Sequence, residues 1–149
     1  MFNLSQKSID KLAGVDPRLV TVVKRAIQLS TVDFGVTEGL RTLETQKKYV
    51  AAGKSQTLQS KHLNGHAVDL VAYVDGNVSW ELNLYDNIAD AVAKAAREIG
   101  LPICWGAAWT VPDITKWNST MEDAMNHYID TRRNQGKRPF IDGPHFEIA

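Results

Sequence analysis

The sequence has one cysteine, no excess of either charge and no long apolar run. Because Cys104 is the one cysteine among 149 residues, a framework of intramolecular disulfides is excluded. Lys and Arg number 17, as do Asp and Glu, so there is no overall basic field for nucleic acid or anionic lipid. A membrane-spanning helix needs about 18 consecutive apolar residues, and the sequence has no such run. We expect no nucleic-acid partner, no membrane insertion, and a monomer.

The remaining composition is that of an ordinary globular chain, with 44% apolar and 23% charged residues. No repeat, low-complexity tract or linker divides the chain, so we expect a single domain over residues 1–149. The amino-terminal residues 1–7 lack a basic region followed by an apolar segment. We therefore expect no secretory signal peptide and synthesis in a cytoplasm.

Helices are expected where capping residues precede apolar residues at helical spacing. One helix is expected to begin at Pro17, with Asp16 as its cap. Two more are expected from Thr42 to about Ala52 and from about Tyr85 to Glu98, and a fourth begins at a Ser119-x-x-Glu122 capping box. Strands are expected at Phe34–Thr37, Ala67–Val74, Val78–Trp80, Ile103–Trp105 and His145–Ile148, with a loop over Lys54–Gly65. Helices and short strands mix without regular alternation, which predicts an α+β fold. The expected architecture is a small mixed, mainly antiparallel sheet packed against several helices.

One group of candidate metal ligands lies in the segment Ser60–Asp69, which reads S-K-H-L-N-G-H-A-V-D. A catalytic zinc ion typically takes three protein ligands from His, Asp or Glu and leaves its fourth position to water. His62 would come from a loop and Asp69 from the strand that follows, with Gly65 permitting the turn between them. Alternation along this strand lets Asp69 point toward a site while its two neighbours are buried.

A second group lies near the carboxyl end, in the segment Asp142-Gly143-Pro144-His145. His145 and Glu147 would share one face of a terminal strand, while the alternate residues face the core. The strand could then supply His145 as a third ligand on the sheet. Asp142 precedes it by three residues and a stiff Gly-Pro corner, and is well placed to take a proton from the attacking water.

A rival set uses His62 and His66 as a helical i, i+4 pair, as in His-Glu-x-x-His zinc peptidases. That motif requires a glutamate after the first histidine, where this chain has Leu63, and Gly65 is unfavourable inside a helix. We therefore expect neither His66 nor His127 to be a ligand. Spacing by itself does not distinguish the preferred set from ordinary surface or core histidines.

The Ser60–Asp69 segment resembles the S-x-H-x-x-G-x-A-x-D motif of a family of zinc peptidases. The family includes D-Ala-D-Ala carboxypeptidases and dipeptidases, hedgehog-like domains and phage L-alanyl-D-glutamate endopeptidases. The resemblance implies that His62 and Asp69 bind zinc. The family's third ligand ends an acidic-x-x-His motif, which matches Asp142-x-x-His145, and the acidic residue is the catalytic base. The base is usually Glu, one methylene longer than Asp142, although similar phage endopeptidases carry Asp.

A third match is Gly39–Gln46, G-L-R-T-L-E-T-Q, which resembles the family's G-x-R-[ST]-x-x-x-Q element. The arginine of that element reaches the active site. The resemblance implies that Arg41 stabilises the oxyanion of the tetrahedral intermediate or holds a substrate carboxylate. Further candidates for supporting a ligand or contacting substrate are Ser60, Gln46, Trp109 and Glu147.

Together the motifs predict a zinc-dependent peptidoglycan endopeptidase, an endolysin that hydrolyses the L-Ala–D-Glu bond of stem peptides with one catalytic Zn²⁺. Two alternatives stay open: a D-Ala-D-Ala dipeptidase or carboxypeptidase, and a zinc-bearing binding module without catalysis. The presence of both Arg41 and Asp142 favours catalysis. Since no signal peptide or separate cell-wall-binding domain is visible, we expect the enzyme to wait in the host cytoplasm for holin-dependent release to the periplasmic wall. The segment from Trp109 to Phe140 has no assigned role.

Overall fold

A five-stranded antiparallel sheet with helices packed against it makes up the fold, described by a computed structural model for residues 1–55, 57 and 59–149. In chain order the elements are α1 (Gln6–Lys11), α2 (Pro17–Leu29), β1 (Asp33–Glu38), α3 (Leu43–Ala51), the 3₁₀ helix η1 (Lys61–Asn64), β2 (Ala67–Val74), β3 (Asn77–Ser79), α4 (Leu82–Ile99), β4 (Ile103–Trp105), the 3₁₀ helix η2 (Ile114–Lys116), α5 (Met121–Asn134) and β5 (His145–Ile148). The predicted α+β class is confirmed, and each described strand pair is antiparallel.

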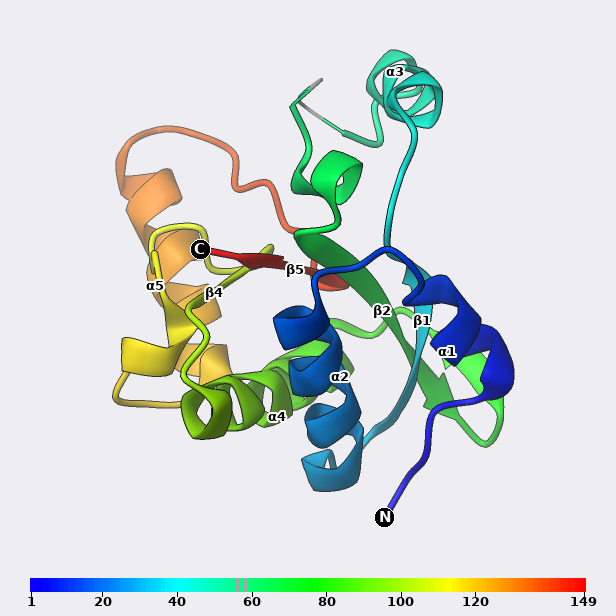
Figure 1. The fold of residues 1–149 in the computed structure, drawn as a ribbon. Coiled ribbons are helices and arrows are strands. Elements are labelled where there is room, and N and C mark those ends of the chain that lie inside the picture. The colour runs from blue at the N-terminus through cyan, green and yellow to red at the C-terminus, as the bar shows by residue number, and fades with distance from the viewer. Residues whose placement is uncertain (56, 58) are drawn as a thin grey trace.

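The sheet is organised around β2. The strand order is β1-β2-β5-β4, and β3 pairs with β2 off this path. Residues 67–69 of β2 pair with β5, residues 72–74 pair with β3, and β1 pairs along most of the strand. The carboxyl-terminal strand therefore lies between β2 and β4 in the middle of the molecule (Figure 1).

The two long helices α2 and α4 pack against each other, and α4 contacts the sheet (Figure 1). Asp16 caps α2 by accepting a hydrogen bond from the Arg18 backbone N–H, and Pro17 occupies the first turn, as predicted. The apolar side of α4 is rich in alanine, which lets α2 approach closely. No helix within the described residues is both long and apolar enough to cross a membrane. The α3 helix and η1 lie beyond the end of the sheet where β2 begins (Figure 1).

Three predictions of secondary structure need correction. The expected loop from Lys54 to Gly65 contains η1, because the Ser60 hydroxyl accepts a hydrogen bond from the His62 N–H and closes a turn; residues 56 and 58 of that loop lie outside the described residues. The α5 helix is capped by Thr120, not Ser119, because the Thr120 hydroxyl accepts from the N–H three residues later. The α4 helix begins at Leu82, three residues before the expected start.

The α1 helix was not predicted at all, and a tertiary contact explains it. Ser5 caps the helix by accepting from the Ser8 N–H. The Ser8 side chain is buried, and its hydroxyl accepts from the Val36 N–H of β1 at 2.9 Å. A hydrogen bond between residues 28 positions apart has no signature in local periodicity.

Asp86 is a buried carboxylate that opposes folding at neutral pH. Its residue is 7% exposed, and it makes no hydrogen bond to a described residue. Burial, with a further contribution from Glu122 and Asp90, raises the pKa of Asp86 from 3.8 to about 6. The folded state therefore holds the proton more tightly than the unfolded state, so stability falls as the pH rises through this window.

We expect Asp86→Asn to raise the melting temperature at pH 7, because the amide has no charge to bury. The melting curves of variant and wild type should converge as the pH falls below 3.8, where the Asp86 carboxyl becomes protonated in the unfolded state as well, and separate as the pH rises to about 6. Thermal unfolding followed by circular dichroism across this range checks the prediction. Asp130→Asn, an exposed change on α5, is the control, and an equal shift in both variants would contradict the assignment to Asp86.

Candidate metal centre

His62 is held with one ring nitrogen free for a metal. It lies on η1, which ends at Gly65 in the left-handed conformation with φ 74°, and its side chain is 1% exposed. The ring Nδ1 lies 2.8 Å from the Gly39 carbonyl oxygen. A carbonyl can only accept, so Nδ1 carries the proton and donates, which leaves the Nε2 lone pair toward Asp69, 3.1 Å away.

Asp69 and His145 are brought together by strand pairing. In the antiparallel ladder of β2 and β5 they are directly opposite one another, so their side chains project from the same face of the sheet. The His145 Nδ1 lies 3.2 Å from the Asp69 Oδ1. Burial raises the pKa of Asp69, but the close contacts with the His145 and His62 rings outweigh burial and hold the pKa well below its usual range.

Glu147 orients the His145 ring from its other side. The His145 Nε2 lies 2.8 Å from the Glu147 Oε1, and Glu147 in turn pairs with Lys61 at 3.3 Å. Burial lowers the pKa of His145, but its bonds to Asp69 and Glu147 prevail and raise the pKa to about 9. The surroundings of His145 therefore favour positive charge at this position.

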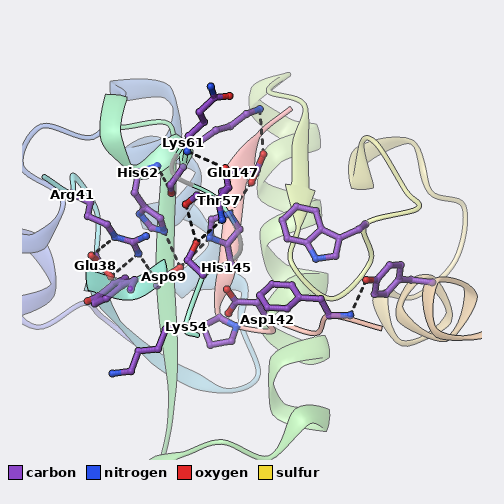
Figure 2. A pocket seen from close by; sticks show the side chains of 18 of the residues that line it. Glu38, Arg41, Lys54, Thr57, Lys61, His62, Asp69, Asp142, His145 and Glu147 are labelled. Carbon is purple, nitrogen blue, oxygen red and sulfur yellow. Dashed lines mark hydrogen bonds and ion pairs between the residues drawn. The ribbon is translucent and has the colours of Figure 1, made fainter. Parts of the chain in front are cut away.

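The ligand atoms of His62, Asp69 and His145 all lie within 4.8 Å of one another, so the three residues could hold a metal ion. Figure 2 shows them pointing toward one another, with Arg41 and Glu38 beside Asp69 and Glu147 beside His145. The donor set is two imidazole nitrogens and one carboxylate oxygen, which suits a divalent first-row ion. Each histidine also has a hydrogen-bond acceptor on its second nitrogen, as ligating histidines usually do.

The histidines that were expected not to be ligands lie outside this group. His66 is 42% exposed at its side chain and sits 3.9 Å from the Asp16 carboxylate. His127 shares a hydrogen bond of 3.0 Å with the Thr110 hydroxyl. The rival i, i+4 pair is therefore not brought together with Asp69 and His145.

Arg41 is tied to the metal group through Asp69. Its Nε and Nη2 donate to the two carboxylate oxygens of Glu38, and Nη2 also reaches the Asp69 Oδ2 at 3.4 Å. Gln46 is fully buried and accepts from Nη1, which places it behind Arg41 and not in the cleft. The Tyr49 ring lies 4.6 Å from the guanidinium carbon. Sequence reasoning missed Glu38, although an acidic residue three positions before an arginine is a local signal.

Asp142 lies in the turn that leads into β5, and Gly106 fixes the position of that turn. The Asp142 N–H donates to the Gly106 carbonyl at 2.9 Å, and the Gly106 N–H donates to the His145 carbonyl at 2.8 Å. A Cβ at residue 106 would lie 2.3 Å from the Asp142 carbonyl oxygen, so a side chain there would collide with the turn. Burial, with a contribution from Asp69, raises the pKa of the Asp142 carboxyl.

The two tryptophans that flank this glycine have different positions. Trp105 is fully buried, and its indole N–H donates to the Gly143 carbonyl at 2.8 Å, so this residue belongs to the core. Trp109 lines the cleft with its ring 5.8 Å from that of His145. Its indole N–H is buried and has no hydrogen-bond partner among the described residues.

The ligand group opens into a cleft of about 840 Å³. One wall comes from the α3 side, with Tyr49 and Lys54, and the opposite wall comes from α5 and the segment after it, with Arg132 and Phe140. Ser60, Asp142 and Glu147 also line it. A cleft of this volume lies within the usual range for sites that bind a ligand.

An antiparallel sheet that carries a His-Asp-His group, with the half-buried Asp142 carboxyl and an arginine lining the same cleft, is the arrangement of a metal-dependent hydrolase. The chain belongs to the phage L-alanyl-D-glutamate peptidase family, whose pattern it matches over residues 1–149. The family resemblance and the peptidase activity predicted from the motifs are thereby confirmed.

Several relatives support this assignment. The L-alanyl-D-glutamate peptidase of Escherichia phage T5 is 30% identical over 152 residues, covering 99% of this chain and 98% of that protein. The protein of the same name from Listeria phage A118 is 29% identical over 109 residues, 73% of this chain and 38% of the relative. The crystal structure of the Serratia marcescens L-Ala D-Glu endopeptidase ChiX matches with a TM-score of 0.73 and 39% identity, over 99% of this chain and 90% of that one.

We expect Gly106→Ala to weaken metal binding and hydrolysis together, because the added Cβ would meet both the Asp142 carbonyl oxygen and, at 2.9 Å, the His145 Cβ. Overpacking of this kind typically costs about 1–3 kcal/mol of stability. Metal content and activity per folded molecule are measured alongside chemical unfolding. Gly76→Ala is the control, because its positive φ of 79° strains the backbone of the variant while nothing lies within 4 Å of its added Cβ. Equal metal content and activity in the two variants would contradict the role of Gly106.

Proposed function

We propose that this protein is a zinc-dependent peptidoglycan endopeptidase that hydrolyses the L-Ala–D-Glu bond of stem peptides. The observation that carries the proposal is the convergence of His62, Asp69 and His145 on one point of a cleft of about 840 Å³, in a member of a peptidase family. The cleft lining mixes apolar side chains with hydroxyl, amide and charged groups, which suits a peptide.

Zinc is the ion that we assign to the site. Three protein ligands of the His and Asp type are the usual set of a catalytic zinc, which keeps a further position for the reaction. The two contacts of 3.1 and 3.2 Å between the Asp69 Oδ1 and the histidine nitrogens fit donors that surround one small ion. Zinc bound there would polarise the scissile carbonyl and lower the pKa of the attacking water.

Asp142 is the general base in this mechanism. Its carboxylate takes a proton from the water as the water oxygen bonds to the carbonyl carbon of L-Ala. As the bond from that carbon to the D-Glu nitrogen breaks, the Asp142 carboxyl returns the proton to the leaving amine. The raised pKa of Asp142 supports this role, because a carboxyl that both accepts and returns a proton works best with a pKa nearer neutrality.

Arg41 supports the reaction in two ways in this proposal. Its guanidinium holds Asp69 in place through the 3.4 Å contact, while Glu38 and Gln46 fix the guanidinium itself. Five N–H groups are present on a guanidinium, and four are engaged by these partners. The remaining N–H on Nη1 is available to stabilise the negative charge that develops on the substrate carbonyl oxygen.

The biological role that we infer is host cell lysis. The phage family supports it, as do the phage relatives that match this chain over most of its length. The enzyme would remain in the host cytoplasm until a holin opens the inner membrane, and would then reach the wall.

Digestion of purified sacculi, with products identified by mass spectrometry, tests the proposed function. We expect muramyl-L-Ala products and peptides with a new D-Glu amino terminus, about one zinc ion per chain, and loss of activity with a chelator that zinc reverses. Release of terminal D-Ala with the L-Ala–D-Glu bond intact would indicate the carboxypeptidase alternative. Full zinc content with no product of either kind would indicate a binding module.

We expect Asp142→Asn to retain zinc and to lose hydrolysis by about 10²–10⁴-fold, because the amide cannot accept the proton from water. Zinc content and turnover of a defined muropeptide are measured on the same preparation. Asp130→Asn makes the same chemical change at an exposed position of α5 and should leave both values unchanged. Turnover of Asp142→Asn within a few fold of wild type would rule out Asp142 as the base.

A further inference from the structure

The cleft wall formed by α5 and the segment that follows it carries an unpaired cation, Arg132. The residue is half-buried on α5 and lines the same cleft as the metal group. Its Nε and Nη2 donate to the Arg138 carbonyl oxygen at 3.3 and 3.1 Å. Its guanidinium is therefore held by a backbone acceptor, which leaves the positive charge and the Nη1 N–H groups without a carboxylate partner among the described residues.

The other charges of the cleft are largely paired within the protein. Arg41 is bound to Glu38 and Asp69, and Lys61 is bound to Glu147. Lys54 lies 5.8 Å from the Tyr49 ring and makes no ion pair with a described residue, but it is attached to the opposite wall. Among the arginines in the described cleft lining, Arg41 is paired with two carboxylates, whereas Arg132 is paired with none.

The position of Arg132 is fixed by its surroundings. The Arg138 carbonyl belongs to the segment that connects α5 to Asp142, and the Phe140 N–H of that segment donates to the Tyr128 hydroxyl at 3.0 Å. The guanidinium is therefore held in place at the cleft, and its planar set of N–H donors matches the geometry of a carboxylate.

We propose that Arg132 binds a free carboxylate of the stem peptide and so selects an anionic peptide for cleavage; this inference rests on the proposed function. A peptide cut at L-Ala–D-Glu carries a free carboxylate on the D-Glu residue and, where diaminopimelate follows, another on that residue. A fixed guanidinium loses little side-chain entropy on binding, so the contact favours either carboxylate over its amide. The Trp109–Phe140 segment, which the motifs left without a role, then becomes the recognition wall.

The test compares three synthetic peptides: L-Ala-D-Glu-diaminopimelate, the same peptide amidated on the free D-Glu carboxylate, and the same peptide with L-Lys in place of diaminopimelate. Each is cleaved by wild type, Arg132→Gln and Arg132→Lys, and kcat and KM are measured separately. Arg133→Gln is the matched control, because it removes the same charge from the next residue of α5, which is exposed and does not line the cleft.

We expect wild type and Arg133→Gln to cleave one of the two altered peptides at least about tenfold less efficiently, mainly through KM, as loss of a charge-assisted hydrogen bond predicts. Arg132→Gln should cleave the unaltered peptide at that reduced efficiency and no longer distinguish the altered one. Arg132→Lys should recover part of the difference. The bound carboxylate is identified by the altered peptide that wild type cleaves poorly but that Arg132→Gln cleaves as efficiently as the unaltered peptide.

Two results would overturn the proposal. One is an Arg132→Gln enzyme that keeps wild-type efficiency or still distinguishes the same peptide as wild type. The other is loss of that discrimination in Lys54→Gln and not in Arg132→Gln. A fall in kcat for all three peptides, with discrimination retained, would mean that Arg132 merely supports the Asp142 segment. If wild type releases L-Ala from none of the peptides, the proposed function fails instead.

Discussion

The candidate metal centre depends on the antiparallel pairing of β2 with β5. Asp69 and His145 are 76 positions apart in sequence, yet the ladder sets them directly opposite. A slip of one residue in this register would turn one of the two side chains to the other face of the sheet. The pairing of β5 with β4 in turn positions Asp142, because Gly106 at the end of β4 hydrogen-bonds to the backbone of both Asp142 and His145.

The charged side chains around the centre favour a bound cation, and their hydrogen bonds hold the candidate ligands in one geometry. Asp69, Glu147 and Glu38 supply negative charge, which Arg41 and Lys61 offset from the outside. Without a metal, the raised pKa of His145 keeps its ring protonated, so a proton lies in the position that a bound metal would take. Metal binding at this position would therefore release that proton. The fixed partners of each ligand reduce the reorganisation that binding and catalysis require.

Local sequence predicted much of the fold because caps and periodicity act over short distances. The Asp16 and Thr42 caps, the β2 strand and the terminal strand lie where the sequence indicated. The α1 helix escaped prediction because its stability includes the buried contact between Ser8 and β1. The choice of Thr120 over its neighbour as a cap is a matter of side-chain geometry that residue type alone does not decide, since both are good capping residues.

For the site, the sequence by itself nominated His62, Asp69 and His145 as candidate ligands and Asp142 as the candidate base, and it argued against the rival His66 pair. Residue chemistry and short spacing suggested this set, and the resemblance to the peptidase motifs singled it out and added Arg41. Only the tertiary structure decided which nitrogen of each histidine faces the metal group, that Glu38 and Gln46 fix Arg41, and that Gly106 must lack a side chain. Each of these is a contact between segments, and contacts between segments exist only once the strands have paired and the loops have closed.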